Sequence, residues 1–124
     1  MSQAVGALDI TIVTGAASLA TAQYHFVTLD ANGKAVIGST GGMTIGILQN
    51  TPAVGEAARV RVLGTSKLVM STTINEGDLL KSAAGAGVIV AAAKDFIGAI
   101  ALEASLAPSD IIEVLIIHCI YAGA

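Results

Sequence analysis

Residues 44–82 read TIGILQNTPAVGEAARVRVLGTSKLVMSTTINEGDLLKS, and this stretch decides the fold class. It holds three short apolar segments separated by turn-forming residues, at 45–49, Ala57–Leu63 and 67–70. In the middle segment Arg59 and Arg61 alternate with Val60 and Val62, which is typical of a half-buried β-strand between glycine breaks. We therefore expect Val60 and Val62 to face a core. The two arginines would face water or a partner.

Similar strand patterns continue along the rest of the chain, with turn signals roughly 8–12 residues apart, a spacing typical of a sandwich or barrel. The further expected strands lie at Leu8–Val13, 23–30, 34–37, 88–92, 96–104 and 111–121. Asn32-Gly33 predicts a hairpin turn, and Gly98 is expected to mark a bulge. We expect the last strand to be the most buried. The sequence therefore predicts an all-β fold, a small antiparallel β-barrel or sandwich.

The 124 residues suffice for one domain with its own core. Residues 1–22 are rich in small side chains and show no amphipathic stripe, so we predict an extended N-terminal arm. Residues 23–124 would form the β-barrel-like domain. Arms of this kind are disordered unless something holds them. We therefore expect the strand-like piece Leu8–Val13 to pair with a sheet of another protein or of a neighbouring copy.

The composition favours a protein that buries surface against other chains. Hydrophobic residues make up 54% of the chain and charged residues only 12%, about half the usual charged share. The net charge of −3 and the scattered basic residues argue against nucleic acid as a partner. We find no signal peptide and no apolar run long enough to span a membrane. A single cysteine excludes an internal disulfide, and we expect a soluble protein made inside the cell.

The residues that could carry chemistry do not form a reaction centre. The glycine-rich segments at 38–42 and 85–87 lack the residues that complete a phosphate loop or a dinucleotide motif. His118 and Cys119 would point to opposite faces of a strand, so they cannot share a metal ion, and we expect a buried thiol there. Glu76 and Asp78 flank a turn glycine, which is ordinary turn chemistry. We predict no catalytic, cofactor-binding or metal-binding residue, and we expect no enzyme.

Candidate partner-contacting residues come from the arm and from the central strand. They are Leu8, Ile10, Ile12, Arg59 and Arg61. The two arginines could equally form a solvated strand face, and the sequence leaves both interpretations open.

Several motifs in a fixed order resemble the small capsid decoration, or cement, proteins of tailed bacteriophages. Each motif alone is an ordinary strand or turn, and the resemblance rests on their order over residues 23–117. The motifs are Leu29-Asp30 before the Asn-Gly turn, then IGILQN at 45–50, PAVGE at 52–56, VRVLG at 60–64, INEGDLL at 74–80, IGAIALEA at 97–104 and IIEV at 111–114.

This resemblance implies a β-barrel-like domain that forms a homotrimer on the outer surface of an icosahedral phage head. Its partners would be the major capsid protein and itself, and its role would be to stabilise contacts between neighbouring capsid subunits. The expected location is the virion, after synthesis in the host cytoplasm. The family has no catalytic residues and no cofactor to carry over.

Two other classes of function stay open. A biotinyl or lipoyl carrier barrel would need a modified lysine at a hairpin tip, and the candidates are Lys67, Lys81 and Lys94. A structural subunit of another assembly would fit the same composition.

Overall fold

The computed structural model describes residues 7–15, 17–89 and 95–120, and all regular structure in these residues is β-strand. The ten strands are β1 (Leu8–Val13), β2 (Phe26–Leu29), β3 (Ala35–Ile37), β4 (Gly46–Leu48), β5 (Ala57–Leu63), β6 (Thr65–Val69), β7 (Leu79–Ala83), β8 (Ala86–Ile89), β9 (Phe96–Ala101) and β10 (Ile111–Ile120). The all-β class is therefore confirmed. None of the described residues belongs to a helix long and apolar enough to cross a membrane.

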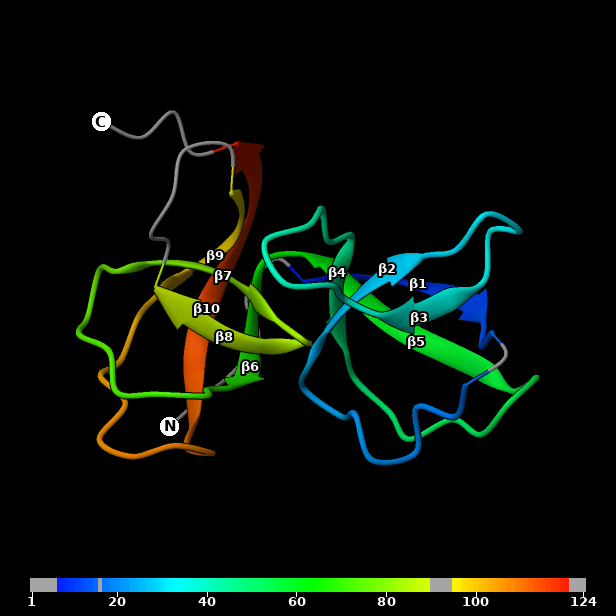
Figure 1. Ribbon diagram of the computed structural model, residues 1–124, viewed down its shortest axis with the longest axis horizontal. Helices are drawn as coiled ribbons and strands as arrows, with labels where there is room; N and C mark the ends of the chain where they lie inside the picture. The colour runs from blue at the N-terminus through cyan, green and yellow to red at the C-terminus, as the bar shows by residue number, and fades with distance from the viewer. Residues whose placement is uncertain (1–6, 16, 90–94, 121–124) are drawn as a thin grey trace.

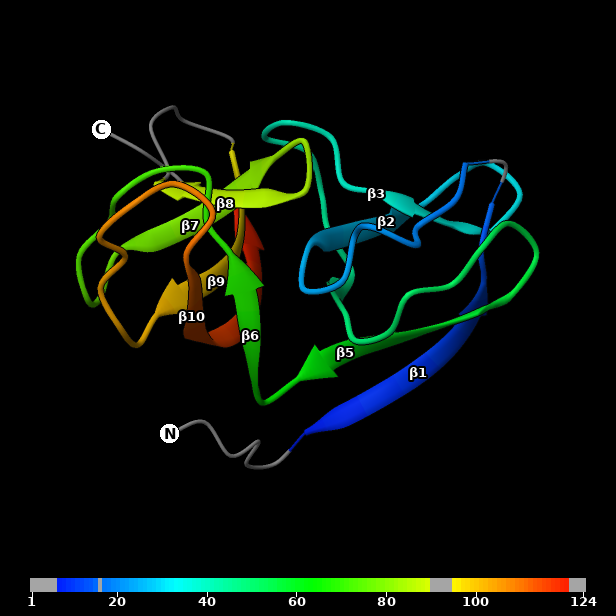
Figure 2. The same ribbon diagram turned by 90° about the horizontal axis from the view of Figure 1, so that it is seen from below.

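The strands form two five-stranded antiparallel sheets, which appear as two lobes in Figure 1. The first sheet has the order β1-β5-β4-β2-β3 and the second the order β6-β10-β9-β7-β8. The sharp turn from β5 into β6 joins the lobes and lies at the lower centre of Figure 2. Gly64, with a φ of 92°, makes this turn. Each sheet curls until its outer strands meet at one parallel bridge, Thr14–Ala35 in the first and Met70–Gly87 in the second. Neither sheet closes into a barrel. Of the two expected forms, barrel and sandwich, the fold is therefore the sandwich.

Each sheet surrounds its own hydrophobic core. The first core consists of Leu19, Ala22, Val27, Ala35, Leu48, Ala58 and Val60. The second consists of Phe26, Ile47, Leu68, Met70, Ile74, Leu80, Ala99, Ala101, Ile112, Val114 and Ile116. Phe26 and Ile47 belong to strands of the first sheet but pack in the second core, so they join the two lobes.

Local chemistry explains where the best-predicted elements begin and end. The expected bounds of the central strand agree with β5, where Val60 is buried and Arg59 is exposed. The Asn-Gly hairpin joins β2 to β3, and Gly33 has a φ of 76°. The Asp30 side chain accepts hydrogen bonds from the Asn32 and Lys34 amides and so closes the turn. A register shift does occur opposite Gly98, but the extra residue lies in the partner strand β10, between Ile116 and Cys119, and not in the strand of Gly98.

Several strand predictions were wrong: no expected strand covers β7, and the strand expected at 96–104 ends at Ala101. Two further differences have a clear physical reason. The strand expected from residue 23 begins only at Phe26, because Tyr24 has a φ of 63° and the His25 amide bonds the Ala22 carbonyl in a turn. The last strand was expected to be the most buried, but in β10 only alternate residues are buried. Ile111 and Leu115 lie on its exposed face. An apolar sequence therefore does not place both faces of this strand in a core.

The strand-like piece of the predicted arm forms β1, which pairs along its length with β5 of the same chain. Its other side is an edge of the first sheet. Residues 1–6 of the arm lie outside the described residues, as do 90–92 of the strand expected at 88–92. The boundary at residue 22 between arm and domain stays a prediction.

Candidate interaction surface

All five residues predicted to contact a partner lie on one two-stranded ribbon, β1 with β5. Because Ile10 pairs with Val60 and Ile12 with Ala58, these side chains share the face of the ribbon that covers the first core. Ile12 packs against that core, whereas Ile10 is exposed at its margin.

The two arginines lie on the opposite face of the ribbon. Arg59 is opposite Thr11 and Arg61 is opposite Asp9. The five residues therefore do not form one patch. Leu8 is exposed at the start of β1, next to a register shift.

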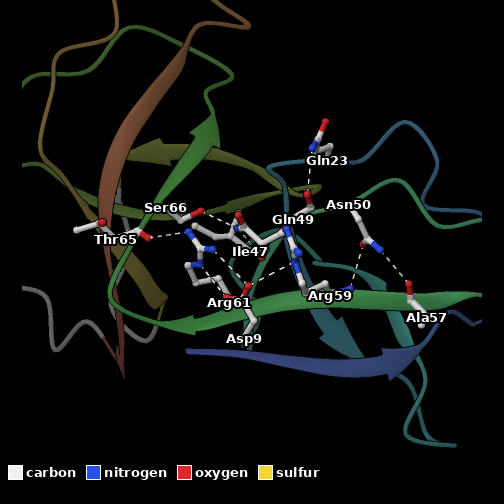
Figure 3. Close-up of polar contacts among 10 residues, drawn as sticks. All are labelled: Asp9, Gln23, Ile47, Gln49, Asn50, Ala57, Arg59, Arg61, Thr65 and Ser66. Atoms are coloured by element: carbon white, nitrogen blue, oxygen red, sulfur yellow. Dashed lines mark hydrogen bonds and ion pairs between the residues drawn. The ribbon is translucent and has the colours of Figure 1, made fainter. Parts of the chain in front are cut away.

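Arg61 is held by an ion pair that ties β1 to β5, as Figure 3 shows. Its Nε and Nη2 donate to the two carboxylate oxygens of Asp9 at 2.8 and 3.3 Å, and its Nη1 reaches the Thr65 carbonyl at 3.4 Å. Arg59 also contacts Asp9, at 3.4 Å. The Arg61 side chain is 16% exposed and that of Arg59 58%. Of the two, only Arg59 presents most of its side chain to solvent or a partner.

A buried glutamine connects the lobes beside this ion pair (Figure 3). Gln49 Nε2 donates to the Ile47 carbonyl at 3.0 Å and to Ser66 Oγ, on the second sheet, at 2.8 Å. The Gln49 carbonyl accepts a hydrogen bond from Gln23 Nε2 at 3.0 Å. This network fixes the lobes relative to each other and leaves the Gln49 side chain no role at the surface.

The structure exposes large apolar side chains that sequence reasoning missed. They are Val13, Leu29, Ile37, Met43, Val54, Leu63, Ile89, Leu102, Leu106, Ile111, Leu115 and Ile120. Leu106 is 83% exposed, in a loop where the sequence gives no sign of a core position. Exposed apolar surface of this extent is consistent with burial against other chains.

Leu106 also borders an open cleft of about 230 Å³ lined by residues of the loops 73–75 and 104–106. Ser105 is buried there, and its hydroxyl oxygen lies 3.1 Å from both the Thr72 and the Ala107 carbonyl oxygens, so its single proton is shared between them. The residues that line the cleft are Thr73, Ile74, Asn75, Ala104, Ser105 and Leu106, and none of them is ionisable.

The histidine and cysteine of the last strand lie apart from any metal-binding arrangement. His118 Nε2 is 3.0 Å from the Ile45 carbonyl, which links β10 to the first lobe. Cys119 is exposed, so the prediction of a buried thiol was wrong. β6 pairs with β10 only as far as Leu115, and Cys119 lies in the part of β10 that extends beyond β6. No group of three or more His, Cys, Asp or Glu among the described residues could hold a metal ion.

The lysines considered for a carrier domain are not at hairpin tips where the structure describes them. Lys67 lies within β6, with its Nζ 5.8 Å from the centre of the Tyr24 ring. Lys81 lies within β7 and pairs with Asp95 at 2.9 Å. The tip of the β7–β8 hairpin is Ala84-Gly85. Lys94 lies outside the described residues.

Comparison with known proteins gives a likeness in fold. No protein-family model matches the chain, and no curated protein matches it. Among solved structures, the crystal structure of the head fiber gp8.5 N base in bacteriophage phi29 has a similar fold, with a TM-score of 0.70 and 12% sequence identity. The match covers 90% of this chain and 94% of that chain. It shows that both chains share the same fold over nearly their whole length.

Proposed function

We propose that this protein is a structural component of a tailed-phage head. It would bind the outer surface of the icosahedral shell as a homotrimer and stabilise contacts between major capsid subunits. The observation that carries the proposal is the fold, which matches the base of a phage head fiber over 90% of the chain. The order of sequence motifs that resembles phage decoration proteins supports it independently.

The surface fits a binding protein better than an enzyme. Charged residues are only 12% of the chain, while a dozen and more large apolar side chains are exposed. A shell-stabilising protein needs apolar area and several simultaneous contacts, because linked sites multiply a modest affinity through effective concentration. It needs neither a cofactor nor a reactive side chain. The partners in this proposal are the capsid protein and further copies of the chain, with no nucleic acid and no membrane.

The test is co-sedimentation of the purified protein with phage heads that lack it, followed by a heat or chelator challenge of those heads. Saturable binding in multiples of three that toughens the shell is the expected result. Leu8→Ser should weaken binding, since Leu8 is an exposed candidate contact, while Met43→Ser, which removes a similar exposed side chain elsewhere, should not. Absence of binding to both expanded and unexpanded heads would contradict the proposal.

A further inference from the structure

The two lobes are copies of one five-stranded unit. The strand order of the second sheet repeats that of the first, each strand being replaced by the one five places later. The residue pairs across the strands repeat as well. Each pair of the first lobe has a counterpart in the second: Ile10–Val60 corresponds to Ser66–Val114, Leu48–Val60 to Ala101–Val114, Phe26–Ile47 to Leu79–Ile100, and Val27–Ile37 to Leu80–Ile89. The bridge Thr14–Ala35 corresponds to the bridge Met70–Gly87.

The connecting loops repeat in the same detail. The hydrogen bond from Thr14 N to Glu56 O in the first lobe matches that from Met70 N to Asp110 O in the second. The bond from Ala53 N to the Glu56 side chain matches that from Ala107 N to the Asp110 side chain. The bond from Tyr24 N to Leu48 O matches that from Gly77 N to Ala101 O. Positive φ angles also fall at matched positions, Tyr24 with Gly77 and Gly55 with Ser109. These correspondences assign every strand of one lobe an equivalent in the other.

In the second lobe, the gap between the outer strands is filled by the first lobe. Just before the Met70–Gly87 bridge, residues 24–26 lie between β6 and the β7–β8 hairpin. Val69 N donates to Tyr24 O at 2.8 Å, and Phe26 N donates to Gly85 O at 2.7 Å. The Phe26 ring is 0% exposed and completes the second core. Figures 1 and 2 both show the β7–β8 hairpin reaching toward the first lobe.

The equivalent gap in the first lobe lies between β1 and the β2–β3 hairpin. Its two sides are Val13, the equivalent of Val69, and Gly33, the equivalent of Gly85. Val13 is 42% exposed, and no atom lies within 4 Å of a Cβ built on Gly33. A Cβ on Gly85, by contrast, would lie 2.6 Å from the Ile37 side chain. Ile10 and Leu29, both on the core-facing side of their strands, are exposed near this gap.

The segment equivalent to residues 24–26 is 77–79, and it is accessible. Gly77 is exposed, and Asp78 and Leu79 are half-buried. We propose that residues 77–79 of one copy of this chain fill the gap between β1 and the β2–β3 hairpin of a second copy. The contact repeats between chains the junction that joins the lobes within a chain. It rests on the self-association included in the proposed function and names the surfaces that carry it.

The contact follows strand-pairing chemistry. Leu79 N donates to Gly33 O and Val13 N donates to Gly77 O of the other copy, while Leu79 covers the apolar margin of the first core. Because the two surfaces differ, the contact is head-to-tail, and such contacts form a closed ring when the rotation allows it. A ring of three copies would contain six five-stranded units, all joined by the same kind of junction.

A disulfide tests the contact directly. Within the chain, a Cβ on Gly85 would lie 3.4 Å from the Cβ of His25, close to disulfide geometry. The equivalent pair between copies is Gly33 with Asp78. In a Cys119→Ser background, which removes the exposed thiol, Gly33→Cys with Asp78→Cys should form oxidised multimers on a non-reducing gel. Gly55→Cys with Asp78→Cys is the matched control, since Gly55 also has positive φ and open space around it.

Alanine at the same two glycines gives a second readout without cross-linking. Gly33→Ala and Gly55→Ala carry the same backbone cost, but only the first adds a methyl group inside the proposed contact. Sedimentation velocity should show self-association weakened ~10-fold or more by Gly33→Ala relative to Gly55→Ala.

Cross-linking that is equal in the two cysteine variants, or absent from both, overturns the contact, as does a chain that stays monomeric at high micromolar concentration. Head binding by the unmodified chain is measured separately. Heads that bind a chain without this cross-link leave the proposed function standing, and a cross-linked chain that binds no heads leaves the contact standing.

Discussion

Gly98 of β9 lies directly against the ring of Phe26, so that a Cβ at residue 98 would stand 2.6 Å from the Phe26 Cε1 atom. The hydroxyl of Thr44 would lie 2.8 Å from the same Cβ. Phe26 belongs to the first sheet but is buried in the second core. The absence of a side chain at residue 98 is therefore what lets the two lobes approach.

Gly98→Ala should destabilise the protein by about 1–3 kcal/mol, because a buried ring cannot move aside without disturbing the core. Urea denaturation measures the loss. Phe26→Leu supplies the control in a double-mutant cycle, since a smaller side chain leaves room for the methyl group. If the two substitutions add without coupling, the close approach of Gly98 to Phe26 is not the cause.

Ser109 and Gly55 occupy matched loop positions in the two lobes, so exchanging serine and glycine between them tests the backbone strain at each position. Ser109 has a φ of 71°, where its equivalent Gly55 has 81°, and a side chain is disfavoured in this region. Ser109→Gly should stabilise by about 0.5 kcal/mol, the relief of strain being offset in part by the greater freedom of the unfolded chain. Gly55→Ser should cost about 1 kcal/mol, although nothing lies within 4 Å of its new Cβ. Thermal unfolding should shift in opposite directions for the two variants.

The sequence predicted the strands that carry their own signals. The alternation of Arg59 to Val62 between two breaks predicted β5, and an Asn-Gly pair predicted the β2–β3 turn. The spacing of turn signals predicted the all-β class, which the structure confirms, whereas neither sheet forms the closed barrel that the resemblance implied. Local periodicity and turn chemistry were enough for these elements, because each depends on neighbours in the chain.

The repeat of the two lobes could not be predicted from the residues, because backbone hydrogen bonds define it. Matched positions carry side chains as different as Arg61 and Leu115 or Tyr24 and Gly77. The face of β10 could not be predicted for a related reason. Both faces carry mainly apolar residues, and Glu113 is the one polar residue among Ile111, Glu113, Leu115 and Ile117 on the face turned away from the core, so the alternation is too weak to show which side faces the second core. The pairing of Asp9 with Arg61 joins residues far apart in sequence and leaves no local signal.

Removing the Asp9 carboxylate should loosen β1 selectively. Asp9→Asn removes the negative charge that pairs with Arg61, whose side chain is mostly covered. The substitution should lower the free energy of unfolding by about 1 kcal/mol. Hydrogen exchange should become faster in residues 8–13 and remain unchanged in β10, because β1 is an edge strand that pairs along its length with β5. Arg59→Ala is the control, since that side chain is largely exposed and its contact with Asp9 is longer. Equal acceleration of exchange throughout the chain would show that the pair does not act on β1 locally.

The buried Gln49 network should matter more for stability than the surface ion pairs. Gln49→Leu removes the donor to Ser66 Oγ and to the Ile47 carbonyl and leaves these acceptors buried between the lobes. An unsatisfied buried polar group costs about 1–3 kcal/mol, so the urea midpoint should fall clearly. Gln23→Ala removes only a half-buried side chain that donates to the Gln49 carbonyl, and it should cost less. If Gln49→Leu is neutral, water or a shift of the lobes must satisfy Ser66, and the network does not fix the junction.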